Sequence, residues 1–165
     1  MKTIYVIRHA KSGWGDFTQP DFERTLNDRG KRDAPEMARR LKKRGVEIDV
    51  FVSSPAKRAR STCEYFCEAY DVKKHDILLI DALYNESADA IYEVIADLSD
   101  KYDHVAIFTH NPGITTFANS LTSTVRIDNM PTCGIFAVEA GIRHWSAFRG
   151  AEKKFLFFDY PKAAD

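Results

Sequence analysis

Short runs of apolar residues alternate along the chain with longer stretches in which apolar residues recur every three or four positions. The short runs are rich in Val, Ile, Leu and Phe, and continuous runs of this length are typical of strands buried on both faces of a sheet. The first run begins close to the N-terminus and ends in Arg8 and His9. We therefore expect strands over residues 3–8, 48–53, 76–80, 105–109, 135–139 and 155–158, with extended backbone over 145–148.

The longer stretches have the spacing of amphipathic helices. The first follows Asn27, a favoured N-cap residue, and ends near Gly45, which suits a helix C-terminus. Pro35 falls inside this stretch, so we expect either a kink or a helix that restarts with Asp33 as its cap. The basic run over 39–44 is expected to be the solvated face of this helix. Further helices are expected over 55–70, 88–98 and 114–121.

Strands that alternate with helices predict an α/β fold. Parallel neighbours need crossover connections, and the crossover helices then cover both faces of the sheet. We expect a three-layer αβα arrangement with a mostly parallel central sheet, and an antiparallel edge made by the last strands, which no helix joins. A chain of 165 residues is long enough for one core, so we expect a single domain over residues 1–165.

The balanced charge of the chain does not indicate a partner that is bound through an overall excess of charge. Lys plus Arg and Asp plus Glu each number 24, which gives no reason to expect binding to nucleic acid or to an anionic membrane. No apolar run approaches the length of a membrane span, and the first strand leaves no room for a targeting peptide. We expect a cytoplasmic protein. Its cysteines are Cys63, Cys67 and Cys133, an odd number without a CxxC pair, and we expect buried free thiols.

Arginine and histidine side chains follow three of the expected strands. Arg8 and His9 end the first strand, Arg58 lies near the start of the helix after the second, and His110 follows the fourth. Parallel strands bring their carboxyl ends to one edge of the sheet, where α/β proteins place their sites. Guanidinium groups and helix N-termini are the groups that bind phosphate. The sequence therefore predicts a phosphate site built from side chains, since it has no glycine-rich phosphate loop. No spacing of histidines and carboxylates indicates a metal, and no cofactor is expected.

Several of these residues lie in an ordered set of motifs that spans almost the full chain: Arg8-His9-Ala-Lys-Ser12, Leu26-Asn-Asp-Arg-Gly30, Ser54-Pro-Ala-Lys-Arg58-Ala, Leu83-Tyr84, Thr109-His110-Asn-Pro-Gly113 and Pro131-Thr132. This set resembles the histidine phosphatase superfamily, which has the phosphoglycerate-mutase-like fold. Within it the chain is most similar to the short SixA-like phosphohistidine phosphatases. One departure is Ala10, where much of the superfamily has glycine, and alanine is restrictive there only if φ is positive.

The resemblance implies that His9 is the nucleophile that becomes phosphorylated. It also implies that Arg8, Arg58 and His110 hold and neutralise the phosphoryl group. A neutral imidazole can attack phosphorus if an acceptor such as a backbone carbonyl holds its other nitrogen. Two guanidinium groups and a second imidazole, expected to be protonated, would then meet the charge on the phosphoryl oxygens.

Other polar residues lie beside these four. Ser12, Thr62 and Asn111 are candidates for substrate binding, although capping or turn roles explain them equally well. Superfamily members that cleave alkyl phosphates commonly carry a glutamate that protonates the leaving oxygen. Glu86 is the candidate for such a general acid here, and it does not match the acid motif securely. A phosphohistidine needs less help, because imidazole leaves more readily than an alkoxide.

Three functions therefore remain open at this stage. The first is a cofactor-independent phosphohistidine phosphatase that acts through a phospho-His9 intermediate on a phosphorylated protein. The second is a broad phosphomonoesterase for small metabolites, with Glu86 or another carboxylate as the acid. The third is a non-catalytic module that binds phosphate or phosphopeptides. In the loop that follows the first strand, we expect Trp14 and Phe17 to pack the loop down rather than to border a ligand.

Overall fold

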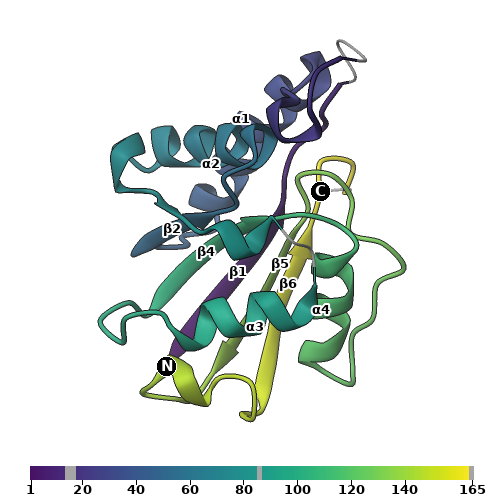
Figure 1. The fold of residues 1–165 in the computed structure, drawn as a ribbon. Helices are drawn as coiled ribbons and strands as arrows, with labels where there is room; N and C mark the ends of the chain where they lie inside the picture. Colours follow the sequence, from purple (N-terminus) through teal and green to yellow (C-terminus); the bar gives the residue numbers. More distant parts are fainter. Residues whose placement is uncertain (14–17, 85–86, 164–165) are drawn as a thin grey trace.

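A six-stranded sheet forms the centre of the computed structural model, which describes residues 1–13, 18–84 and 87–163 (Figure 1). The strand order across the described part of the chain is β3-β2-β4-β1-β5-β6. The strands are β1 (Lys2–Arg8), β2 (Val50–Ser53), β3 (Leu78–Leu79), β4 (His104–Thr109), β5 (Ile135–Ala140) and β6 (Lys153–Asp159).

The sheet is parallel on one side of β1 and antiparallel on the other, as the sequence predicts. β4 pairs in parallel with both β1 and β2, and β2 pairs in parallel with β3. β5 is antiparallel to β1, and β6 is antiparallel to β5. In the ladder, Arg8 lies beside Thr109, and Ile7 lies beside Ile135. The carboxyl ends of β1, β2 and β4 therefore meet the amino end of β5 at one edge of the sheet.

Helices cover both faces of the sheet. α1 (Asp28–Lys43) and α2 (Lys57–Ala69) lie together on one face, while α3 (Ala88–Ala96) and α4 (Gly113–Leu121) lie on the other (Figure 1). The prediction of a three-layer αβα fold is confirmed.

Alternate residues of β1 enter two separate cores, which explains why the strand reads as a continuous apolar run. Ile4 and Val6 pack in the cluster that contains the apolar residues of α3 and α4. Tyr5 and Ile7 pack in the cluster that contains those of α1 and α2. A strand buried on both faces has no polar positions to alternate with.

Two local predictions need correction. α1 runs without a break from Asp28 to Lys43, so the restart at Asp33 is wrong. Asn27 caps the helix by accepting a hydrogen bond from the Gly30 N–H at 2.9 Å, and the buried apolar face beyond Pro35 keeps the helix together. The segment expected to be extended at 145–148 instead contains a 3-10 turn, η4 (Trp145–Ala147). The buried Trp145 indole donates to the Tyr102 carbonyl at 2.8 Å, which fixes this turn.

Gly30 allows the start of α1 to lie directly on the backbone that leaves β1. A Cβ atom at this position would stand 2.1 Å from the Lys11 carbonyl oxygen, far inside van der Waals contact. The Asn27 N–H also donates to the same carbonyl, at 3.0 Å. Only glycine fits between α1 and this backbone without displacing one of them.

We expect Gly30→Ala to lower the free energy of unfolding by roughly 1–3 kcal/mol, the usual cost of overpacking. Urea denaturation measures this change. Gly150→Ala is the matched control, because a Cβ there has no atom within 4 Å, and it should shift stability by less than about 0.5 kcal/mol. Equal stability of the two variants would show that the contact between α1 and Lys11 is not constrained.

Candidate active site

A pocket of about 360 Å³ lies at the edge of the sheet where β1, β2 and β4 end. Arg8, His9, Arg58 and His110 all line it, so residues far apart in the sequence come together as predicted. Arg8 ends β1, Arg58 is in the first turn of α2, and His110 lies between β4 and α4. The other lining residues are Lys11, Ser12, Asp21, Arg24, Asn111 and Thr132.

Backbone hydrogen bonds hold His9 from two sides. Its N–H donates to the Thr109 carbonyl at 3.2 Å, and its carbonyl accepts from the Cys133 N–H at 3.1 Å. The next N–H, that of Ala10, donates to the Thr62 hydroxyl at 2.9 Å. Ala10 is not among the described residues with positive φ, so alanine fits where much of the superfamily has glycine. The position of the His9 ring is therefore set by β4, α2 and the segment before β5.

The His9 ring is held in one tautomer, with Nε2 unprotonated. Nδ1 lies 2.8 Å from the Ala10 carbonyl oxygen, which can only accept, so Nδ1 carries the proton and Nε2 keeps its lone pair. Burial lowers the pKa of His9 to about 3, and the positive charges of Arg58 and Arg8 act in the same direction. The imidazole is therefore neutral at pH 7, as a nucleophile requires.

His110 is the second imidazole of the pocket, and its ring centroid lies 5.2 Å from that of His9. Burial lowers the pKa of His110 to about 4, and Arg58 lowers it further. The ring is therefore neutral at pH 7 in this structure, contrary to the expectation of a protonated group. Its Nε2 lies 2.8 Å from the Ser54 hydroxyl, and its buried Nδ1 has no hydrogen-bond partner among the described residues. Nδ1 thus remains available to a phosphoryl oxygen.

The two predicted arginines lie close enough to repel one another. Burial lowers the pKa of Arg8, and the charge of Arg58 lowers it further. Arg8 donates from Nη1 to the Met130 carbonyl at 2.8 Å, while its buried Nε has no partner in the part of the chain that the structure describes. The half-buried Arg8 and the buried Arg58 together favour an anion between them, and Arg8 Nε is a donor that such an anion could use.

Asp21 contributes a carboxylate to the pocket, and this was missed at the sequence level. Burial alone would raise its pKa, but hydrogen bonds from Tyr84 and Arg24 and the charge of Arg58 lower it to about 2. Asp21 is therefore ionised at neutral pH and holds no proton for a leaving group. The only sign of Asp21 as a site residue in the sequence was its place near the oppositely charged Arg24, in a loop without the residue spacing of a helix or a strand.

The remaining predicted site residues have different outcomes. Ser12 and Asn111 line the pocket, and Ser12 accepts from Arg24 Nη2 at 2.8 Å. Thr62 is not among the lining residues, and its binding of substrate stays a prediction. Its buried hydroxyl donates to the Arg58 carbonyl at 2.8 Å and accepts from Ala10, so it joins α2 to the residue after His9. Glu86, the candidate acid, and residues 14–17 of the adjoining loop lie outside the described residues.

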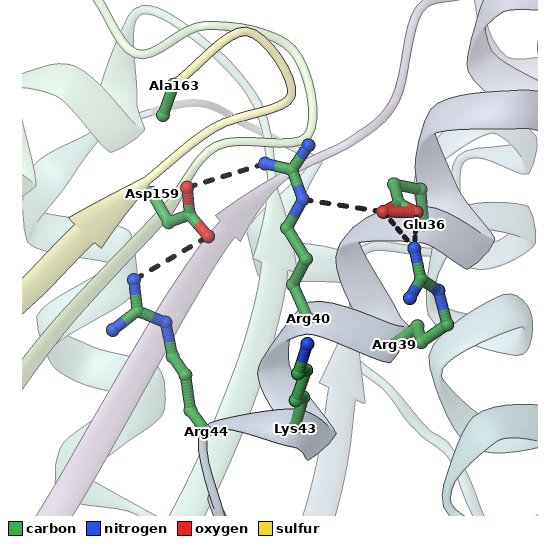
Figure 2. Close-up of a pocket in the computed structure, with 7 residues that line it drawn as sticks. All are labelled: Glu36, Arg39, Arg40, Lys43, Arg44, Asp159 and Ala163. Carbon is green, nitrogen blue, oxygen red and sulfur yellow. Dashed lines mark hydrogen bonds and ion pairs between the residues drawn. The ribbon is translucent and has the colours of Figure 1, made fainter. Parts of the chain in front are cut away.

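A second pocket, of about 770 Å³, lies between α1 and the end of β6 (Figure 2). Its three arginines are paired with carboxylates, and Lys43 also lines it. Arg40 lies between Glu36 and Asp159, at 3.6 Å from each, and Arg44 lies 3.7 Å from Asp159. Arg40 also donates to the carbonyls of residues 160 and 161, so this part of the basic run ties down the C-terminal segment rather than facing solvent alone. Two carboxylates line this pocket with four cations, whereas Asp21 is the one carboxylate among the described residues that line the pocket at His9 with four cations, so the latter is the stronger anion site.

Other features of the chain add little to the chemistry. Among the described residues, no group of three or more His, Cys, Asp and Glu side chains could together hold a metal ion. No helix in this part of the chain is long and apolar enough to cross a membrane. Cys63, Cys67 and Cys133 are buried free thiols, as predicted.

The buried imidazoles make stability depend on pH. His9 and His110 stay neutral in the folded protein down to about pH 3 and 4, whereas in the unfolded chain they bind protons below about pH 6.5. Each should therefore reduce the free energy of unfolding by up to about 1.4 kcal/mol per pH unit as the pH falls from 6.5 to 4. Urea denaturation across this range should show a shallower slope for His110→Asn. A slope identical to that of the wild type would contradict the burial of a neutral ring.

Comparisons with known proteins agree with this geometry. Residues 4–83 match the family model of the histidine phosphatase superfamily (branch 1). An uncharacterized chloroplastic protein of Arabidopsis thaliana is 26% identical over 152 residues, which are 87% of this chain and 69% of that protein.

Solved structures share the fold over the whole chain. The candidate phosphohistidine phosphatase SixA from Agrobacterium tumefaciens superposes with a TM-score of 0.80 at 24% identity, over 97% of this chain and 98% of that one. A protein histidine phosphatase SixA complexed with tungstate gives a TM-score of 0.80 at 19% identity, over 96% and 97% of the two chains. The N-terminal part of the chain is thus similar to the histidine phosphatase superfamily, and the whole chain shares its fold with the SixA structures.

Proposed function

We propose that this protein is a SixA-like phosphohistidine phosphatase that works through a phospho-His9 intermediate. One observation carries the proposal: the His9 Nε2 lone pair is held, unprotonated, in a pocket with two guanidinium groups and a second imidazole. The substrate is a phosphorylated molecule, and a protein phosphohistidine is the class that the site favours.

The first step transfers the phosphoryl group to His9. The Nε2 lone pair forms a bond to phosphorus, the bond from phosphorus to the leaving imidazole nitrogen breaks, and that nitrogen takes up a proton from solvent. Arg8, Arg58 and His110 Nδ1 lie around the same pocket, where they would meet the negative charge of the phosphoryl oxygens. In the second step a water oxygen bonds to phosphorus, the Nε2–phosphorus bond breaks, and inorganic phosphate leaves. Neither step calls for a cofactor.

The ionised carboxylate of the pocket favours a substrate whose leaving group needs no proton donor. Asp21 is the one carboxylate among the described residues that line the pocket, and its pKa of about 2 keeps it ionised. An alkoxide needs a proton from such a group in order to leave, whereas an imidazole leaves far more readily. The site therefore favours a phosphoramidate over an alkyl phosphate.

The intermediate is directly testable. After brief exposure to a radiolabelled phosphohistidine peptide, the wild type should carry a label that is labile in acid and stable in alkali. His9→Ala should carry none and should show no turnover, while the exposed His75→Ala should behave as the wild type. A label of the same stability on His9→Ala would overturn the assignment of the nucleophile.

Arg58→Ala should lower kcat by about 10²–10³, if the loss of one preorganised donor costs as much here as in an oxyanion hole. Steady-state turnover of a phosphohistidine peptide and of an alkyl phosphate measures both this loss and the substrate class. We expect faster turnover of the phosphohistidine peptide. A strong preference for the alkyl phosphate would instead identify a phosphomonoesterase, and phosphate binding without turnover of either would identify a binding module.

A further inference from the structure

We infer that Asp21 is a positioning residue that holds the Arg58 guanidinium in the orientation that a phosphoryl group meets. The inference rests on the proposed function, since it assigns to Arg58 the task of binding the phosphoryl oxygens. It adds a residue to the site that neither the motifs nor the predicted strand ends contain.

One residue engages both terminal nitrogens of Arg58. Nη1 donates to the Asp21 carbonyl oxygen at 2.8 Å, and Nη2 donates to Asp21 Oδ2 at 3.0 Å. Two acceptors from one residue fix both the plane of a guanidinium and its rotation, because its donors form a rigid fork. Arg58 is only 5% exposed, so it cannot exchange these bonds freely with solvent.

Asp21 is itself held in place from two further sides. The Tyr84 hydroxyl donates to Oδ2 at 2.8 Å, and Arg24 Nη1 donates to Oδ1 at 3.1 Å. Arg24 reaches on to Ser12, which follows shortly after His9 in the chain. The Asp21 side chain is 46% exposed, but both of its carboxylate oxygens accept hydrogen bonds, and these contacts hold it against Arg58.

This arrangement leaves donors for a substrate. A guanidinium has five N–H groups, and Asp21 takes two of them among the described contacts. The positive charge of Arg58 lowers the pKa of Arg8. The Asp21 carboxylate offsets part of that positive charge. Arg58 can therefore stay ordered beside a second guanidinium before any phosphoryl group arrives.

A double-mutant cycle between Asp21 and Arg58 tests the inference, with p-nitrophenyl phosphate as the substrate. We expect Asp21→Ala to lower kcat/KM by about ten- to a hundredfold, the range for losing hydrogen bonds to a charged group. In the Arg58→Ala background the same change should have less than about a twofold effect, because the group it positions is gone. Asp21→Asn keeps an oxygen acceptor and should retain more activity than Asp21→Ala. Glu23→Ala, an exposed carboxylate in the same short segment, is the matched control and should have little effect.

Inorganic phosphate binding, measured by calorimetry on the same variants, separates this inference from the proposed function because it needs no turnover. Removal of a negative charge from the pocket would by itself tighten phosphate binding. Loss of a positioned Arg58 should weaken it instead, and we expect Asp21→Ala to bind phosphate more weakly than the wild type. Tighter binding, or effects of the two substitutions that simply add, would overturn the inference even if the phosphatase activity is established.

A comparison of two leaving groups tests whether Asp21 acts as a proton donor instead. If Asp21 positions Arg58, Asp21→Ala should slow p-nitrophenyl phosphate and an alkyl phosphate by the same factor. A much larger loss on the alkyl phosphate, which needs a proton more, would show that Asp21 is a general acid and would overturn the positioning role.

Discussion

The fixed backbone of His9 is the constraint on which the site depends. β1 lies in the middle of the sheet, so the residue after it is hydrogen-bonded to β4 on one side and to the segment before β5 on the other. The Ala10 carbonyl then sets the tautomer of the ring from within the same stretch of chain. A nucleophile whose direction is set by backbone needs no rearrangement of side chains to face its substrate.

Electrostatics in the pocket follow from burial more than from net charge. The chain carries equal numbers of basic and acidic residues, yet Arg8 and Arg58 converge at one sheet edge. Burial next to these guanidinium groups keeps both imidazoles neutral, which suits His9 as a nucleophile. Asp21 is the local counter-charge, and its contacts with Arg58 explain how a buried guanidinium can remain charged beside Arg8. A phosphoryl dianion would add the negative charge that the rest of the pocket lacks.

The sequence predicted those parts of the site that topology alone determines. Arg8, His9 and His110 follow apolar runs, and parallel strands bring such ends together whatever the details of packing. It could not place Asp21, because the stretch before α1 has no period and its approach to α2 depends on contacts with Arg58. The hydrogen bond between the Thr62 hydroxyl and the Ala10 N–H could not be predicted either. Residue spacing shows that Thr62 lies on a helix, but it does not show which backbone group its hydroxyl contacts. The conformation around Trp145 was predicted wrongly for a similar reason: an aromatic residue in a short mixed segment can fill a core from a tight turn as well as from extended backbone.

The central claim is that His9 Nε2 faces phosphorus in a pocket made by Arg8, Arg58 and His110. A crystal structure of the protein soaked with orthovanadate, which mimics a phosphoryl group in transfer, tests it most directly. The account predicts vanadium bonded to or in direct contact with His9 Nε2, with its oxygens hydrogen-bonded to both arginines and to His110. Vanadate bound only among the paired arginines near Asp159, or in the pocket with His9 turned away from it, would contradict the account.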